Sequence, residues 1–137
     1  MPASAPGAHR EDKPVRHDPV ELGRLILERA ALELSRPGVW NPGGLAHDER
    51  GRRVVTTSRR AVQFSAHGMI LRELARKRLH VTTEDRVYRR IAEALAAVIR
   101  EREGGDDDDG DTIADYEDAA PTVDVVLDML DAARYRL

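Results

Sequence analysis

Apolar side chains recur at helical spacing in four stretches of the chain. The first stretch follows Asp18 and Pro19, a helix-capping residue and a proline suited to a first turn, and it predicts a helix over residues 18–36. Ser58 is placed to cap a second helix that runs to about Arg78. Small residues along this second helix favour close packing against a neighbour.

The third stretch has the clearest amphipathic pattern. The sequence Thr82-Thr83-Glu84-Asp85 is typical of a capped helix start. The apolar stripe that follows consists of Val87, Ile91, Ala94, Leu95, Val98 and Ile99. After the glycine- and aspartate-rich residues 104–111 we expect a short turn over residues 113–118, and then a last helix that begins near Pro121 or Thr122.

Between the first two helices the pattern changes to turns and short extended pieces. Asn41–Gly44 predicts a loop, and Asp48–Gly51 predicts a turn before the β-rich residues 53–57, so a small hairpin is expected. The sequence therefore predicts a mainly α fold, a compact four-helix bundle with a short loop or β-hairpin insertion between helices 1 and 2. We expect a disordered tail at residues 1–17 and a single helical domain at 18–137, with an acidic loop at 104–111.

Composition narrows the classes of protein that fit. Hydrophobic residues make up 41% of the chain and aromatic residues 4%, which favours a core of aliphatic side chains between helices. There is no cysteine, so disulfides and thiolate chemistry are excluded. No apolar run is long enough for a signal peptide or a membrane span, and we expect a cytoplasmic protein without a membrane partner.

Charge is separated along the chain. Residues 50–78 contain nine Arg or Lys and one Glu, whereas residues 103–131 contain twelve acidic residues and no basic one. The candidate basic surface consists of Arg52, Arg53, Arg59, Arg60, Arg72, Arg76 and Arg78. Such a surface suits nucleic acid, but the acidic segment could instead fold back and neutralise it, and we favour the second interpretation.

Signatures of metal and cofactor chemistry are missing from the sequence. None of the five histidines is paired at a spacing that places two ligands on one helical face, and we expect no metal site. The aspartate run before Gly110 does not fit a calcium loop, because Gly105 and Tyr116 would fall at its first and twelfth positions. There is no phosphate-binding glycine loop, so no cofactor is expected. His67 could act as a general base if Asp118 or Glu117 approached it.

Three segments carry a family resemblance. They are Trp40-x-x-x-Gly44-Leu45-Ala46-x-Asp48-x-x-Gly51-Arg52, then Ala61-x-x-Phe64-Ser65-x-x-Gly68, and Ile113-Ala114-Asp115-Tyr116-Glu117-Asp118 followed by Thr122. Over residues 20–133 the chain resembles an uncharacterised family of small helical proteins from actinomycetes and their phages, which carries no established activity. The family often has Trp-Cys near position 41, a second Cys near 65 and Trp-Asn-Asp ending at 118. Asn41, Ser65 and Tyr116-Glu117 stand there in this chain.

The motif residues lie on three segments that could converge at one end of the fold. The candidate motif site consists of Trp40, Asp48, Phe64, His67, Tyr116 and Asp118. A structural alternative, which we favour, is that Asp48 and Asp118 bond backbone amides or arginines and brace an irregular loop.

Three functions follow as hypotheses. The one we favour is a non-enzymatic protein-binding or regulatory adaptor, with a partner of unknown identity and with a homodimer possible. The second is a nucleic-acid-binding protein that uses the basic residues of 50–78. The third is a small-ligand protein or enzyme that uses His67 with Asp48 or Asp118.

Overall fold

The computed structural model describes residues 18–103 and 111–137, most of which are helical. The five helices within these residues are α2 (Pro19–Leu34), α3 (Ala66–Arg76), α4 (Val81–Glu103), α5 (Asp111–Ala119) and α6 (Val123–Arg136). Two short strands, β1 (Ala46–His47) and β2 (Gln63–Phe64), lie between α2 and α3 in sequence. The expected mainly α fold with a small β insertion is confirmed. The expected tail at 1–17 and residues 104–110 of the acidic loop lie outside the described residues.

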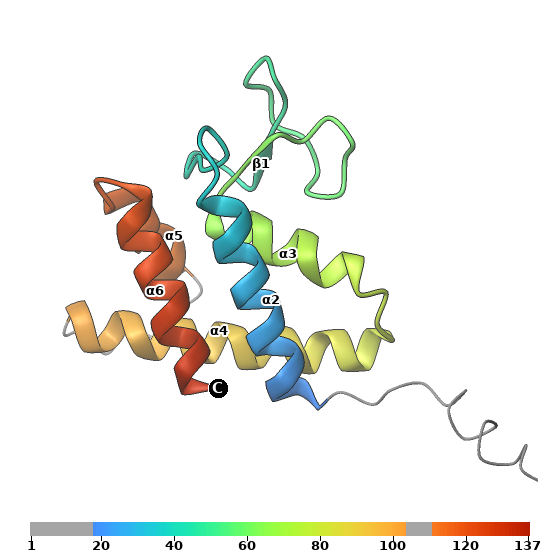
Figure 1. Ribbon diagram of the computed structural model, residues 1–137, viewed down its shortest axis with the longest axis vertical. Coiled ribbons are helices and arrows are strands. Elements are labelled where there is room, and N and C mark those ends of the chain that lie inside the picture. The colour runs from blue at the N-terminus through green and yellow to red at the C-terminus, as the bar shows by residue number, and fades with distance from the viewer. Residues whose placement is uncertain (1–17, 104–110) are drawn as a thin grey trace, which may run out of the picture.

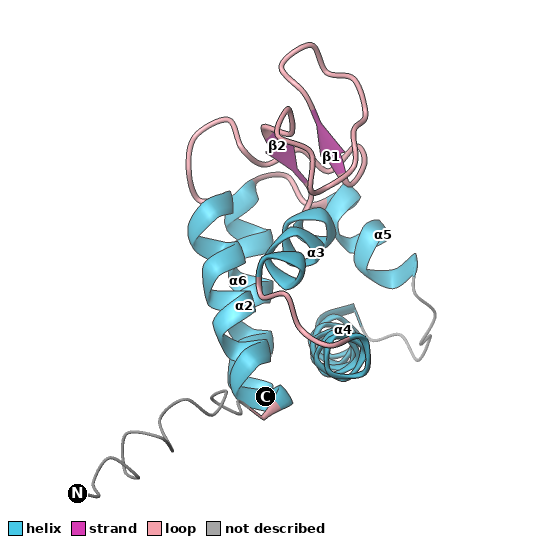
Figure 2. Cartoon of the chain, turned by 90° about the vertical axis from the view of Figure 1, so that its right-hand side faces the viewer, coloured by secondary structure: helices cyan, strands magenta, loops and turns pink. Residues whose placement is uncertain are grey.

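Helix α2 is the centre of the helical part. It packs against α3, α4 and α6, and α2 and α6 lie side by side while α4 runs across them (Figure 1). Figure 2 shows α4 end-on, with α3 beside α2 and the loops of residues 35–65 gathered at one end. The helices are therefore not aligned as in the four-helix bundle that the sequence predicted. None of the described helices is long and apolar enough to cross a membrane.

The ends of α2 follow the sequence signals. Asp18 Oδ1 accepts a hydrogen bond from the Glu21 amide at 2.9 Å, and Pro19 occupies the first turn, where its missing N–H has no consequence. The helix buries Ile26 and Ala30. Gly23 allows close approach, because a Cβ there would stand 2.9 Å from the Leu137 side chain. This end of α2 is consequently packed against the last residue of the chain.

The stripe on α4 is confirmed in full. All six predicted residues are buried, and the helix contacts both α2 and α6. The core that they join also contains Leu22, Leu27, Leu34, Met69, Ile70, Val126, Met129 and Leu130. Aliphatic side chains and two methionines thus make up most of the core, as the low aromatic content predicted.

The predicted start of the second helix is wrong. The helix begins at Ala66, and its N-cap is Ser65, whose hydroxyl accepts from the Gly68 amide at 3.0 Å. Ser58 instead bonds the Arg60 amide within a turn. Residues 63–64 are extended because Phe64 exchanges backbone hydrogen bonds with Val39 and Asn41, a long-range pairing that local sequence does not reveal.

The predicted turn at residues 113–118 is also wrong, because these residues belong to α5. Ile113 and Glu117, one helical turn apart, are both buried, and α5 contacts α3 and α4. A nine-residue helix is marginal by itself, so tertiary packing stabilises it. The described chain therefore has five helices and not the expected four.

The hairpin forms with a different partner from the one expected. Ala46 pairs with Phe64 and His47 with Gln63, antiparallel. The predicted second piece, residues 53–57, contributes only an isolated bridge from Arg53 to His47. Residues 40, 46–47, 53 and 63–64 thus form a small irregular sheet next to the N-terminus of α3.

Candidate functional site

Asp48 organises the turn that follows β1. Its Oδ1 atom accepts from the amides of Arg50 and Arg52 at 2.9 and 2.8 Å, and its Oδ2 atom accepts from Arg52 Nε at 3.1 Å. Gly51 completes the turn with φ +78°, a conformation that favours glycine. These hydrogen bonds, above all the one from the Arg52 amide, lower the pKa of Asp48. The Asp-x-x-Gly-Arg part of the motif is therefore a turn brace.

Gly68 and Leu45 explain a second part of the motif. A Cβ on Gly68 would stand 1.8 Å from the Leu45 carbonyl oxygen, so no larger residue fits without displacement of backbone. The same carbonyl accepts from the Ser65 amide at 3.3 Å. The loop thus lies directly on the first turn of α3, and the glycine fixes that contact.

Trp40, Ala66 and Glu117 meet where the loop, α3 and α5 converge. The Trp40 indole Nε1–H and the Ala66 backbone N–H both donate to Glu117 Oε2, each at 2.6 Å. Ala66 is the first residue of α3, so its amide has no acceptor within the helix, and a carboxylate at this position also interacts favourably with the helix dipole. Glu117 therefore joins three segments through one oxygen atom.

Glu117 is a functional candidate that the sequence suggested only as a partner for His67 and not as the link between these three segments. Its relative exposure is only 2%, and burial raises the pKa of this carboxyl, although the two hydrogen bonds oppose the rise. Two signals in the sequence could have found it. Glu117 follows Ile113 by four residues and so shares its helical face, and a single tryptophan near the core needs an acceptor for its N–H.

The six residues of the candidate motif site are only partly brought together. Trp40 and Phe64 form an isolated bridge beside Asp48's turn. Tyr116 is partly buried and its hydroxyl accepts from Arg102 Nη1 at 3.4 Å. Asp118, by contrast, is exposed on α5, and its neighbour Glu117 takes the buried position.

His67 pairs with a tyrosine and not with a carboxylate. Its Nε2 atom lies 2.9 Å from the Tyr88 hydroxyl, and the two rings stack at 5.9 Å between centroids. Burial lowers the pKa of His67, which favours a neutral ring. The hollow beside this pair measures about 10 Å³, room for a single water molecule at most.

The predicted basic residues make different contacts in the structure. Arg72 donates to the carbonyls of Thr56 and Ser58 at 2.7 and 3.3 Å, and its guanidinium lies 5.0 Å from the Phe64 ring centroid. Arg53 donates to the Gly43 carbonyl at 3.3 Å. Arg76 is paired with Glu73, and Arg78 lies just beyond the C-terminal end of α3. Arg53 and Arg72 therefore brace the loop region, whereas Arg76 and Arg78 lie at the C-terminal end of α3.

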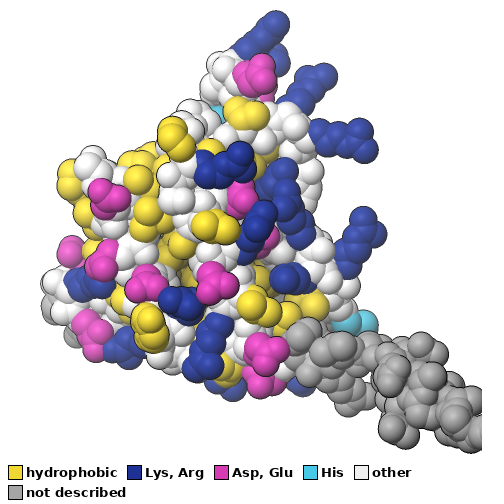
Figure 3. Space-filling model, in the orientation of Figure 1, with side chains coloured by type: hydrophobic (Ala, Val, Ile, Leu, Met, Phe, Trp, Pro, Cys, Tyr) yellow, Lys and Arg dark blue, Asp and Glu magenta, His cyan; other side chains and the backbone are white. Residues whose placement is uncertain are grey.

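The remaining arginines converge on a cleft of about 520 Å³, which we call the arginine cleft. It is lined by Asp48, Glu49, Arg50, Arg52, Arg59, Arg60 and Val62. Figure 3 shows Lys and Arg side chains projecting from this end of the molecule and along the adjoining side. Arg52 is held by Asp48. Within residues 18–103 and 111–137, no acidic group pairs with the side chains of Arg50, Arg59 or Arg60.

The described acidic residues of the C-terminal third do not neutralise this cleft. Asp128 pairs with Arg102, and Asp131 with Arg134. In the part of the chain that the structure describes, no ion pair joins residues 111–131 to residues 50–78. The intramolecular neutralisation that we favoured from the sequence is thus not what these residues do, and residues 106–109 lie outside the described chain.

No metal centre is formed by the described residues, since no three His, Asp or Glu side chains among them gather closely enough to hold an ion. Asp48 and Glu117 are both surrounded by N–H donors, which stabilise a carboxylate but compete with a cation. The buried carboxylates next to the loop therefore act on the protein's own backbone.

These observations define the chain as a mainly helical protein whose motif residues clamp a loop region onto the N-terminus of a helix. The chain belongs to a family described as "Family of unknown function (DUF6197)", whose profile matches residues 21–136. Neither a search of curated proteins nor a search of solved structures gave a match. The resemblance noted from the motifs is confirmed at the level of a family of unknown function.

Proposed function

We propose that this protein is a non-enzymatic binding protein that recognises an acidic segment of a partner protein through the arginine cleft. The observation that carries the proposal is the set of three arginines, Arg50, Arg59 and Arg60, that share a cleft and have no described acidic partner. Guanidinium groups bind carboxylates with paired, directed hydrogen bonds. Their field also speeds the approach of an oppositely charged partner.

The braced loop gives the cleft a defined shape. Arg50 and Arg52 project from a turn that Asp48 holds by three hydrogen bonds, and Arg72 fastens the turn that precedes Arg59. Side chains on a fixed backbone lose less entropy when they bind than side chains on a mobile loop. This supports the arginine cleft as a recognition surface. It also explains why polar side chains bond the backbone of the loop.

The surroundings of His67 support binding over catalysis. The enzyme hypothesis requires His67 to contact Asp48 or Asp118 beside a cavity for substrate. His67 contacts Tyr88 instead, Asp48 is occupied by its own turn, and Asp118 is exposed. The hollow next to His67 is far smaller than a substrate site.

A nucleic-acid partner is the second candidate. It is favoured by the finding that the described acidic residues leave the arginine cleft unneutralised. The lining of the cleft argues against it, because no aromatic side chain lines the cleft to stack on a base. We therefore place an acidic protein segment first.

A binding assay with matched charge variants tests the proposal. Fluorescence anisotropy would compare a labelled oligo-glutamate peptide with labelled duplex DNA and single-stranded RNA, each at low and physiological salt. The double variant R59Q/R60Q removes two cleft arginines. The control R86Q/R90Q removes the same charge from exposed positions on α4.

We expect the peptide to bind, and R59Q/R60Q to weaken it about tenfold or more, since charge-assisted hydrogen bonds are lost. R86Q/R90Q should change binding by less than about twofold, because only long-range charge is altered. Tighter binding of nucleic acid, with the same loss in R59Q/R60Q, would establish the second candidate. Equal effects of the two double variants would reject the cleft as a site.

A further inference from the structure

A second hollow, the α2–α3 groove, lies between the C-terminal end of α2 and one side of α3. It measures about 500 Å³ and is lined by Glu33, Arg36, Pro37, Val39, Ala61, Val62, Phe64, Met69, Arg72, Glu73 and Arg76. Only Val62 is shared with the arginine cleft. The volume lies within the range of small-molecule sites, and apolar side chains contribute to its lining. The groove is therefore a separate candidate site.

Glu73 is the unusual residue of this groove. Its side chain is only 6% exposed, yet no donor among the described residues forms a hydrogen bond with its buried Oε2 atom. The nearest cation, Arg76 Nη1, stands 3.7 Å away, which is an ion-pair distance but too long for a hydrogen bond. Buried carboxylates in folded proteins are almost always hydrogen-bonded. This carboxylate lacks a donor that a ligand could supply.

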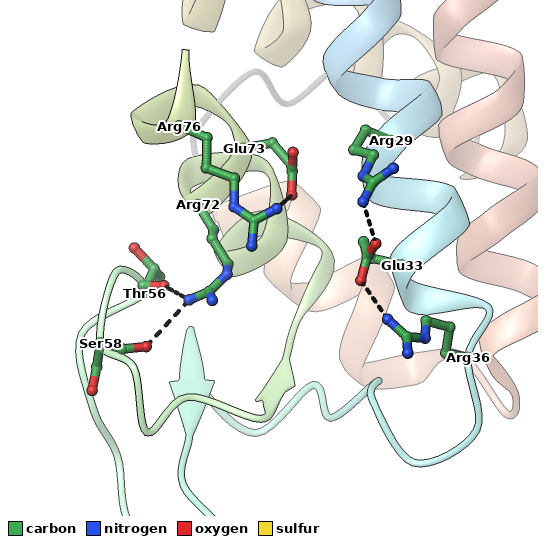
Figure 4. A network of polar contacts seen from close by, with 8 residues as sticks. All are labelled: Arg29, Glu33, Arg36, Thr56, Ser58, Arg72, Glu73 and Arg76. Carbon is green, nitrogen blue, oxygen red and sulfur yellow. Dashed lines mark hydrogen bonds and ion pairs between the residues drawn. The ribbon is translucent and has the colours of Figure 1, made fainter. Parts of the chain in front are cut away.

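The opposite wall carries a second charged group. Glu33 on α2 binds Arg29 at 2.9 Å and Arg36 at 3.2 Å. Figure 4 shows Arg29 and Glu33 on α2 and Arg36 in the turn after it, across from Arg72, Glu73 and Arg76 on α3. Arg36 and Arg76 are the more exposed members, at 68% and 53%, whereas Glu33 and Glu73 are largely buried. The groove thus places carboxylates at its base and guanidinium groups at its rim.

Arg72 is not a member of these ion pairs. Its guanidinium is directed to the Thr56 and Ser58 carbonyls and lies over the Phe64 ring. Arg36 and Arg76 each keep donors that no described acceptor uses beyond a single ion pair. An anionic group at the rim would pair with Arg36 or with Arg76, and a cationic donor deeper in the groove would meet Glu73.

We propose that the α2–α3 groove binds a free α-amino acid with an apolar side chain. In such a ligand one carbon atom separates the ammonium from the carboxylate, so it can pair with Glu73 and Arg76 at the same time. The ammonium supplies the hydrogen bond that Glu73 lacks. The carboxylate pairs with Arg76, and the side chain lies on Val39, Phe64 and Met69, which line the groove.

Both charged ends of the ligand are needed for this match. A simple amine would satisfy Glu73 but would approach Arg36 and Arg76 with a like charge. A simple carboxylate would satisfy the arginines but would leave Glu73 without a donor and add a repulsion. A zwitterion avoids both repulsions, and its net charge of zero separates this site from the arginine cleft, which favours anions.

A titration of the full-length, isotopically labelled protein, followed by amide NMR, tests the site with three probes. The probes are leucine, 3-methylbutylamine, which lacks the carboxylate, and 4-methylpentanoate, which lacks the ammonium. Leucine at millimolar concentration should shift the amides of Val39, Phe64, Met69 and Glu73 in a saturable manner. It should bind about tenfold more tightly than either partial analogue, since each loses a charge-assisted interaction.

The variant E73Q should remove the preference for leucine over 4-methylpentanoate, because the neutral amide no longer favours the ammonium. E93Q, an exposed glutamate on α4, is the matched control and should retain the preference. R59Q/R60Q should leave leucine binding unchanged, so that failure of this site and failure of the arginine cleft can be told apart. The inference is overturned if leucine gives no saturable shifts in the groove, or if E73Q discriminates the probes as the wild-type protein does.

Discussion

The helices α2, α4 and α6 and the loop region of residues 35–65 are held in place by different kinds of interaction. The helices are joined by aliphatic side chains, among them Ile26, Ile91 and Leu130, whose exposure is 1% or less. Ion pairs on their surfaces, such as Arg89 with Asp85, lie in solvent and contribute little. The stability of this part is therefore distributed over many apolar contacts.

The loop region has little regular structure and few apolar contacts of its own. Its strands are two residues long, and its shape depends on hydrogen bonds that Asp48 and Glu117 accept and that Arg72 donates. A region built in this way can be altered by one polar substitution while the helices stay folded. Since both candidate sites include residues of this region, it is where stability and binding can be separated.

The largest loss of stability is expected from a substitution in the helices. Ile91→Ala removes a fully buried side chain from the centre of α4, and we expect a loss of about 2–5 kcal/mol in the free energy of unfolding. Chemical denaturation followed by circular dichroism measures this loss. Helices and loop should unfold together, because the loop has no independent core. Folded structure that persists in the loop region after the helices unfold would contradict the assignment of one shared core.

Gly68→Ala should cause the next largest loss of stability, and the loop should be the first part of the structure to be disturbed. Its Cβ would meet the Leu45 carbonyl at 1.8 Å, and displacement of that backbone should cost about 3 kcal/mol. Hydrogen exchange should show lost protection at the amides of residues 45–48 before any loss in α4. Gly38→Ala is the control, since that position is open but has φ +78°, and it should cost only about 1 kcal/mol.

A smaller effect is expected where α5 meets the loop. Glu117→Ala leaves the Trp40 and Ala66 N–H groups without their acceptor, and we expect a loss of about 2 kcal/mol. Because Trp40 is the only tryptophan, its fluorescence emission reports the change directly. Glu117→Gln keeps an acceptor oxygen, so its Trp40 emission should stay close to that of the wild type. Asp118→Ala, at an exposed position, should change neither stability nor emission, and a large effect there would reinstate Asp118 as the bracing residue.

The sequence predicts the helices α2 and α4 better than it predicts the loop region. The stripe on α4 and the start of α2 at Asp18 and Pro19 could be predicted, because periodicity and capping are local signals. The start of α3 could not, since Ser58 and Ser65 are equally good local caps. Only the pairing of Phe64 with residues 39 and 41 decides between them.

The candidate sites were less predictable for a related reason. The bracing role of Asp48 follows from an Asp-x-x-Gly turn within five residues, and sequence reasoning proposed it. The burial of Glu117 and Glu73 depends on elements far apart in the sequence, and an acidic residue is exposed in most proteins. Arg50 belongs to the basic segment 50–78 but not to the candidate basic surface, and its place in the cleft depends on the turn that Asp48 braces.

The smallest expected effect, and the one that separates the two carboxylates most sharply, is the pH dependence of stability. Glu117 has a pKa raised above its usual 4.5 by burial. The folded state therefore holds the proton more tightly than the unfolded state, and this contribution is present below about pH 4.5 and lost as the pH rises through the folded value. Asp48 has a pKa lowered from 3.8 by hydrogen bonds, so its contribution is present above that pH and lost as the pH falls through the folded value.

Urea midpoints measured between acid and neutral pH for the wild type, E117Q and D48N test these opposite signs. As the pH falls, the wild type should gain stability relative to E117Q and lose stability relative to D48N. Trends of the same sign for both variants would contradict the assignment. A pH-independent difference for E117Q alone would mean that the hydrogen bonds from Trp40 and Ala66 offset the effect of burial on the Glu117 carboxylate. The contact between the loop region and α3 would then depend on the negative charge of Glu117 as well as on the position of its oxygen atom.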